Sequence, residues 1–191
     1  LHIDRPLFGR LLPATTSRDG ATLDADRFVH RVIEAEFGIR LAERVEPIEG
    51  GHTAETIADY VDAVIPAIEV VDYRYESWTL GALQVAADNA IHGWWVSAEP
   101  ITEWRHLELD EVPVTVERND AVETTGVGSN VLGHPLNVVA WLADELPKYG
   151  LGLRAGDLVT TGVTTDVFEA DCGDRITAHF DGLGSVSVQF G

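Results

Sequence analysis

Two stretches in the first half of the chain have the hydrophobic patterns of strands. From Val32 to Ile39 the residues alternate, with Ile33, Ala35, Phe37 and Ile39 on one face and Glu34, Glu36 and Gly38 on the other. Val61 to Val71 is almost continuously apolar and rich in valine and isoleucine, which is typical of a buried strand. Between them we expect a loop at Arg44 to Thr53 and a short helix at Thr53 to Tyr60.

The second half is also mainly of strand character. Ala86 to Gly93 suits a short helix or a turn, and Leu107 to Glu117 alternates as a strand before a turn at Asn119 and Asp120. The clearest helix begins at Pro135, has helical spacing at Leu136, Val139, Ala140 and Ala143, and stops by Gly150. Three further strands are predicted at Leu158 to Thr161, Arg175 to Phe180 and Ser185 to Phe190.

The length and composition suit a single globular domain. The chain has 191 residues, of which 45% are hydrophobic and 24% charged, so residues 1–191 are expected to form one domain around one core. No apolar run reaches the roughly 18 residues that a membrane span needs, and Leu1 to Gly20 lacks the pattern of a signal peptide. The single Cys172 fits a reducing compartment. We therefore expect a soluble, cytoplasmic protein.

The net charge of −19 disfavours one class of binding partner, namely polyanions. Only one lysine, Lys148, stands among the 13 basic residues, so the surface field is expected to repel nucleic acid and anionic membranes. Solubility or a salty habitat explains an acidic surface as well as any special role does. The same charge repels an anionic substrate, which makes a bound cation in an active site more useful.

Three glutamates stand out from the strand patterns. Glu34 and Glu36 are two apart on one strand, so their side chains point to the same side about 7 Å apart along the strand. Glu69 interrupts the apolar run, where an ionised carboxylate without a partner costs several kcal/mol. One Mg²⁺ or Mn²⁺ bound by all three would resolve both problems, because these ions prefer oxygen ligands in octahedral geometry.

A metal held in this way keeps coordination positions open. The carboxylate and the neighbouring keto oxygen of a small 2-oxo acid are suited to fill two of them, with the metal acting as a Lewis acid. The alternative is a structural one. In it, Glu34 and Glu36 form a solvated polar strand face, as is common in antiparallel sheets, and Glu69 pairs with Arg74 or another arginine.

Several blocks of sequence together carry a family resemblance. They are Pro6 with Phe8-Gly9, Ile33-Glu34-Ala35-Glu36, Ile65-Pro66-Ala67-Ile68-Glu69-Val70-Val71 with Arg74 and Trp78, Ala87-Asp88-Asn89-Ala90 with Gly93, Gly126-Val127-Gly128-Ser129, Val131 to Asn137, Arg154 to Asp157, Thr161-Gly162, and Gly173-Asp174 through Gly184-Ser185-Val186. In order and spacing they resemble the fumarylacetoacetate hydrolase superfamily, in its branch of 2-keto-4-pentenoate hydratases and 4-oxalocrotonate decarboxylases. The resemblance runs from about Pro6 to Phe190.

The resemblance implies an α+β fold of mixed, curled β-sheet layers with a few helices, and a bound Mg²⁺ or Mn²⁺. It also implies a homodimer or higher homo-oligomer, with a related pathway enzyme as a further candidate partner. By position, Glu34, Glu36 and Glu69 correspond to the metal ligands.

Other candidates for the site come from the same blocks. Glu36, Arg74 and Asp88 are the catalytic candidates, with Arg74 expected beside the carboxylates and Asp88 expected either to contact metal-bound water or to cap a helix. The candidates for substrate binding are Ser129, His134, Thr161 and Gly162, although His134 also suits the start of a helix. Gly126-Val127-Gly128 is expected to be a turn and not a nucleotide loop, because Val131 stands where a third glycine belongs.

The chain also departs from the family pattern. Members of the family carry an upstream segment with a basic motif whose lysine is implicated in proton transfer, and this sequence begins after it. We expect an N-terminal segment to be missing; the alternative is that the protein lacks this catalytic group. Gln84 and Val85, and the stretch Val163 to Asp166, differ from the usual residues at positions that are expected to line a substrate pocket.

The implied activity is hydration of 2-hydroxypenta-2,4-dienoate to 4-hydroxy-2-oxopentanoate in aromatic catabolism. Decarboxylation of 2-oxo-3-hexenedioate, the 4-oxalocrotonate reaction, is the main alternative, because both reactions use the same electron sink. Two further hypotheses are acylpyruvate hydrolysis and a non-catalytic metal-binding subunit that supports a related enzyme.

Overall fold

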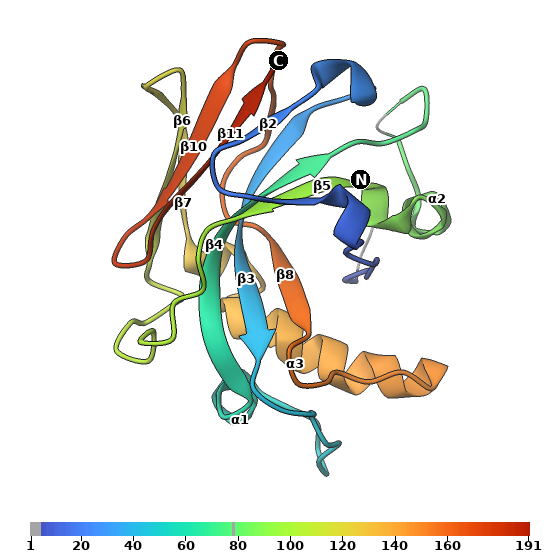
Figure 1. Cartoon of the computed structure of the whole chain (residues 1–191). Coiled ribbons are helices and arrows are strands. Elements are labelled where there is room, and N and C mark those ends of the chain that lie inside the picture. The colour runs from blue at the N-terminus through green and yellow to red at the C-terminus, as the bar shows by residue number, and fades with distance from the viewer. Residues whose placement is uncertain (1–4, 78) are drawn as a thin grey trace.

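Strands dominate the computed structural model, which describes residues 5–77 and 79–191 and so leaves Trp78 outside the described residues. The strands form two sheets, seen in Figure 1 at the upper left and through the centre. Sheet one has the order β1 (Thr16–Arg18), β5 (His92–Ser97), β4 (Val61–Val71), β3 (Val32–Leu41) and β8 (Leu158–Val163), with β9 (Phe168–Glu169) also paired to β3. Sheet two has the order β2 (Ala21–Leu23), β11 (Gly184–Phe190), β10 (Arg175–Phe180), β6 (Pro113–Arg118) and β7 (Ala121–Val127).

Both sheets are mixed because the start of the chain joins each of them. β1 lies parallel to β5, and β2, which follows at once, lies parallel to β11 in the other sheet. The remaining pairs in the sheet orders are antiparallel. The first strands of the chain therefore link the edges of the two sheets.

The helices are few and short. The α-helices are α1 (Ala54–Ala58), α2 (Ala82–Ala87) and α3 (Pro135–Glu145), and the 3-10 turns are η1 (Pro13–Thr15), η2 (Ala25–Arg27), η3 (Asn89–Ile91), η4 (Gly128–Asn130) and η5 (Leu146–Tyr149). Thr53 caps α1 through a capping box with Thr56, and Pro135 occupies the first turn of α3. In Figure 1, α3 crosses the lower part of the molecule beside β8.

The core lies between the sheets. Phe37 of β3 and Phe180 of β10 meet edge to face at 5.1 Å between ring centroids, and both are fully buried. Ile33, Ala35 and Ile39, on the same face of β3 as Phe37, belong to this core as well. Because side chains alternate along a strand, the glutamates of β3 lie on the opposite face of sheet one.

The structure confirms the predicted α+β class, two mixed sheets with few helices, and most of the predicted elements. β3, β4, β8, β10, β11, α1 and α3 lie where their patterns place them, and residues 44–53 form a loop. The prediction of a strand from Leu107 is wrong for its first half, because β6 begins only at Pro113. Leu107 and Leu109 instead anchor turns to the core, so they alternate without forming a strand. Within the described residues, no helix has the length and apolar character needed to cross a bilayer.

Candidate metal centre

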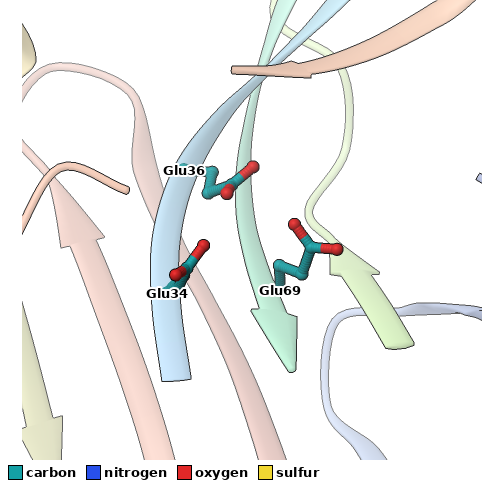
Figure 2. A group of neighbouring side chains, drawn as sticks. All are labelled: Glu34, Glu36 and Glu69. Carbon is teal, nitrogen blue, oxygen red and sulfur yellow. The ribbon is translucent and has the colours of Figure 1, made fainter. Parts of the chain in front are cut away.

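The register of β3 and β4 brings three glutamates together. Glu34 lies directly opposite Glu69, and Glu36 lies one step further along the same face of β3. One carboxylate oxygen from each residue lies within 4.8 Å of the others. Figure 2 shows the three side chains leaving neighbouring strands on the same side of the sheet, with their carboxylates gathered in one place.

The environment of this cluster opposes ionisation. Burial and the nearby charges of Glu69 and Glu34 raise the pKa of Glu36 well above its usual range, although the main-chain N–H of Gly162 donates to its carboxylate. Burial and the charge of Glu69 raise the pKa of Glu34 to about 7, against a hydrogen bond with Glu36 that lowers it. In the absence of a cation, the cluster therefore holds protons near neutral pH.

The donor set fits a hard divalent cation. Glu36 is only 1% exposed, and its Oε2 has no hydrogen-bond partner among the described residues. A buried orphan oxygen beside two further carboxylates is what an oxygen-preferring ion such as Mg²⁺ would satisfy. The structural alternative fails on two points, because Glu36 is not on a solvated face and Glu69 is not paired with Arg74.

The partner of Glu69 is His92, which sequence reasoning did not connect with the glutamates. Nδ1 of His92 lies 2.5 Å from Oε1 of Glu69, and Nε2 lies 3.0 Å from the hydroxyl of Thr15. His92 begins β5, the strand next to β4. Twenty-three positions separate His92 from Glu69, so only a prediction of strand pairing would have brought the two together.

An unusual turn places His92. Asn89, Ala90 and Ile91 all have positive φ values, of 53°, 59° and 57°, and left-handed backbone is costly for a β-branched residue such as Ile91. The side chain of Asn89 accepts from the main-chain N–H of Arg10 at 2.8 Å and donates to the Arg10 carbonyl at 2.9 Å. Beside this clamp, a Cβ on Gly9 would stand 2.4 Å from the Asn89 carbonyl oxygen. The turn thus fixes the segment around Arg10 while it starts β5.

The glutamates open onto a cavity of about 1300 Å³. Its lining includes Thr161 and Gly162, two of the predicted substrate-binding residues. Thr161 is buried and its hydroxyl has no partner among the described residues. Three basic side chains belong to residues that also line the cavity, namely Arg5, Arg10 and Arg154.

Arg74 and Asp88, predicted to be catalytic, lie beside this cavity and not on its wall. They form an ion pair of 2.7 Å, and a carboxylate oxygen of Asp88 also accepts from the Arg74 main-chain N–H at 3.0 Å. Asp88 stands at the C-cap position of α2 and before η3, but within the described part of the chain its side chain makes no capping hydrogen bond and binds Arg74 instead. A smaller cavity of about 270 Å³ is lined by both residues and by His92. Arg74 therefore meets an aspartate and not the three glutamates.

Ser129 and His134 are not among the residues that line the large cavity. The His134 ring accepts from the main-chain N–H of Leu136 and so caps α3, and burial lowers its pKa. Ser129 lies in η4. The positions at which this chain departs from the family pattern do not line the large cavity either; they are Gln84, Val85 and Val163 to Asp166. The predicted roles of these residues toward substrate gain no support from the geometry of this chain.

Comparison with known proteins places this arrangement in a family. Residues 3–190 match the family described as fumarylacetoacetate (FAA) hydrolase C-terminal. The chain belongs to the fumarylacetoacetate hydrolase family. It is 36% identical over 191 residues to a 4-oxalocrotonate decarboxylase of Pseudomonas putida, covering 100% of this chain and 71% of the relative. It is 33% identical over 190 residues to 2-keto-4-pentenoate hydratase 1 of Dechloromonas aromatica (strain RCB), covering 100% and 72%.

Solved structures of this family share the fold closely. The 4-oxalocrotonate decarboxylase of Pseudomonas putida G7 in complex with magnesium and adipate superposes with a TM-score of 0.90 at 34% identity, over 96% of this chain and 69% of that chain. The same enzyme in complex with calcium and acetate gives a TM-score of 0.88 at 34% identity, over 96% and 68%. These relatives are thus enzymes, and one of them has been solved with magnesium in one structure and with calcium in another.

Proposed function

We propose that this protein is a metal-dependent lyase that acts on small 2-oxo acids. The observation that carries the proposal is the cluster of Glu34, Glu36 and Glu69, which lines a large cavity. Hydration of 2-hydroxypenta-2,4-dienoate to 4-hydroxy-2-oxopentanoate is the first reaction to test, because the 2-keto-4-pentenoate hydratases are close relatives over the whole chain. In that reaction the C2 hydroxyl loses its proton as C5 gains one, and water then adds OH at C4 and H at C3, so atoms and charge balance without a redox partner.

Glu34, Glu36 and Glu69 would hold Mg²⁺ or Mn²⁺. When bound, the cation would supply Lewis acidity toward the carboxylate and C2 oxygen of the substrate. The Gly162 N–H stabilises ionised Glu36, and the unpartnered Thr161 hydroxyl beside it is our candidate for orienting the substrate.

Arg74 and Asp88 are proposed to support the site through the residue that follows the turn. The guanidinium of Arg74 donates to the His92 carbonyl, at 3.4 Å, and is itself held by Asp88. Arg74 and Asp88 are thus connected to the proposed metal ligand Glu69 through His92, whose ring contacts the Glu69 carboxylate. Ser129 and His134 would reach a substrate only after a rearrangement, so we give them no step in the reaction.

Decarboxylation of 2-oxo-3-hexenedioate is the second candidate, and one observation favours it. Arg5, Arg10 and Arg154 line a cavity in a chain whose net charge is −19, and guanidinium groups bind carboxylates well. A dicarboxylate would use both the glutamate-bound metal and an arginine of the lining, whereas a monocarboxylate would need only the metal.

We further propose that residues 1–191 act as one catalytic domain in the cytoplasm, within a homodimer or larger homo-oligomer. A large cluster of buried apolar residues that draws on both sheets supports the single domain, and the free, exposed Cys172 fits a reducing compartment. Sedimentation of the purified protein measures the assembly directly.

The deciding experiment is turnover of both substrates with and without Mg²⁺, by the wild-type protein and by Glu36→Gln. The variant removes a charged ligand while keeping the volume of the side chain, so loss of at least about a hundredfold in rate is expected. Glu103→Gln, at an exposed position, is the matched control. Metal-dependent formation of 4-hydroxy-2-oxopentanoate supports hydration, and release of CO₂ from the enedioate supports decarboxylation.

Two other outcomes would overturn the lyase proposal. Hydrolysis of an acylpyruvate to two acids, with no turnover of either lyase substrate, would assign carbon–carbon hydrolysis. Tight Mg²⁺ binding without turnover of any of these substrates would assign the protein a non-catalytic, metal-binding role.

A further inference from the structure

His92 forms a hydrogen bond with one of the two carboxylate oxygens of Glu69, a proposed metal ligand. Its Nδ1 lies 2.5 Å from Oε1 of Glu69, and both residues are buried, His92 with 6% and Glu69 with 9% of their surface exposed. We propose that this contact sets the metal preference of the site, favouring Mg²⁺ over Ca²⁺. The inference rests on the proposed metal centre and goes beyond it by naming a positioning residue and what it selects.

The direction of the hydrogen bond follows from the chemistry of the two groups. An ionised carboxylate has only acceptor sites, so when Glu69 is ionised the ring carries its proton on Nδ1 and donates it to Oε1. One oxygen of Glu69 is then committed to the ring. Oε1 keeps a second lone pair, but the hydrogen bond weakens that oxygen as a ligand, so Oε2 is the better oxygen for a cation.

The ring is held from its other side, so it cannot easily leave Glu69. Its Nε2 lies 3.0 Å from the Thr15 hydroxyl, and Thr15 is anchored in turn by a main-chain bond of 2.9 Å to the Leu12 carbonyl. On the backbone side, His92 follows the left-handed residues of η3, whose conformation is fixed by the clamp between Asn89 and Arg10. Thr15, His92 and Glu69 therefore form a rigid chain of contacts.

A carboxylate limited to one oxygen discriminates between the two cations. Mg²⁺ requires about six oxygens in octahedral geometry and takes carboxylates through single oxygens. Ca²⁺ takes about six to eight oxygens and gains from carboxylates that bind through both. Because His92 donates to Oε1 of Glu69, binding of a cation through both oxygens of this carboxylate is disfavoured, which weakens Ca²⁺ binding. Binding through one oxygen, which Mg²⁺ prefers, is retained.

The test compares the dissociation constants of Mg²⁺ and Ca²⁺, each measured alone by titration calorimetry. His92→Leu removes the donor and keeps a similar volume, whereas His92→Asn keeps an N–H donor close to the Nδ1 position. His106→Leu, at an exposed position, is the control. Thermal unfolding of each variant shows whether it is folded, and turnover is not needed for the readout.

We expect the preference of the wild-type protein for Mg²⁺ to fall by at least about tenfold in His92→Leu, the usual scale for loss of a group that orients a ligand. His92→Asn and His106→Leu should keep it within about threefold. If His92→Leu does not fold, Thr15→Val removes the second anchor of the ring and should lower the preference by about tenfold, outside the range of the controls. An unchanged ratio of the two constants in the folded variant overturns the inference alone, and a wild-type protein that binds neither ion overturns the proposed metal centre as well.

Discussion

At the scale of single residues, the fold holds the three glutamates so close together that the neighbouring negative charges disfavour ionisation of Glu34 and Glu36. Burial and mutual repulsion raise the pKa of Glu34 to about 7 and that of Glu36 well above its usual range. A group with a raised pKa must lose its proton before it can bind a cation, so binding and deprotonation are linked. The cluster therefore responds to pH within the physiological range.

Mg²⁺ affinity is expected to weaken as the pH falls below about 7. Above that value Glu34 is largely ionised without the metal, and below it each unit of pH costs up to about tenfold in affinity for each proton displaced. Calorimetry at pH 6 and pH 8, in buffers of different ionisation enthalpy, counts the protons released. Release should be greater at pH 6, and equal release at both values would contradict the raised pKa.

The glutamates were predictable from the sequence, and the residues around them were not. Glu34 and Glu36 share a face because of strand periodicity, and Glu69 stands out because it interrupts an apolar run. His92 and Asn89 act through contacts with residues 23 and 79 positions away, respectively, which no local pattern records. The positive charge of Arg74 suggests a place beside the glutamates, but in the structure its guanidinium forms an ion pair with Asp88.

At the scale of elements, two glycines let β7 and the turn after it approach other segments closely. A Cβ on Gly126 would stand 2.0 Å from the carbonyl oxygen of Thr164, and one on Gly128 would stand 1.8 Å from that of Leu109. The pair Gly126 and Gly128 is therefore a packing feature. The prediction of a turn at Gly126-Val127-Gly128 is wrong for its first two residues, which end β7, whereas Gly128 begins η4.

Gly128→Ala is expected to lower the free energy of unfolding by about 2–4 kcal/mol, because a backbone carbonyl cannot move aside as a side chain can. Chemical denaturation measures the loss. Gly152→Ala is the matched control, since an added Cβ there meets nothing within 4 Å. Equal stability of the two variants would show that the segment shifts at little cost.

Two strands that the sequence does not predict, β5 and β7, escape prediction for different physical reasons. β5 follows directly after a left-handed turn of non-glycine residues, and nothing in Asn89-Ala90-Ile91 marks that conformation. β7 has little buried surface, so it lacks the apolar alternation of β3. Strands that are held mainly by their partners in the sheet leave a weak local pattern.

At the scale of the whole molecule, an acidic protein has a cavity whose lining includes three arginines. Arg10→Gln should weaken binding of adipate in the presence of Mg²⁺ by about tenfold, the scale of one charged hydrogen bond, and leave hexanoate unchanged. The two ligands differ only in the second carboxylate. Arg44→Gln, whose partner is the exposed Glu46, is the control. Equal weakening of both ligands would contradict a carboxylate-binding role for Arg10.

The pairing of β2 with β11 joins the beginning of the chain to its end. The ribosome makes β11 long after β2, so β2 must wait for it before the two strands can pair. Thr15 lies just before β1, which precedes β2, and it supports the ring that holds Glu69. A chain that lacks β11 would leave β2 unpaired and Thr15 anchored through β1 alone, so under the proposed function the affinity for the cation depends on a strand that is far from the glutamates in the sequence.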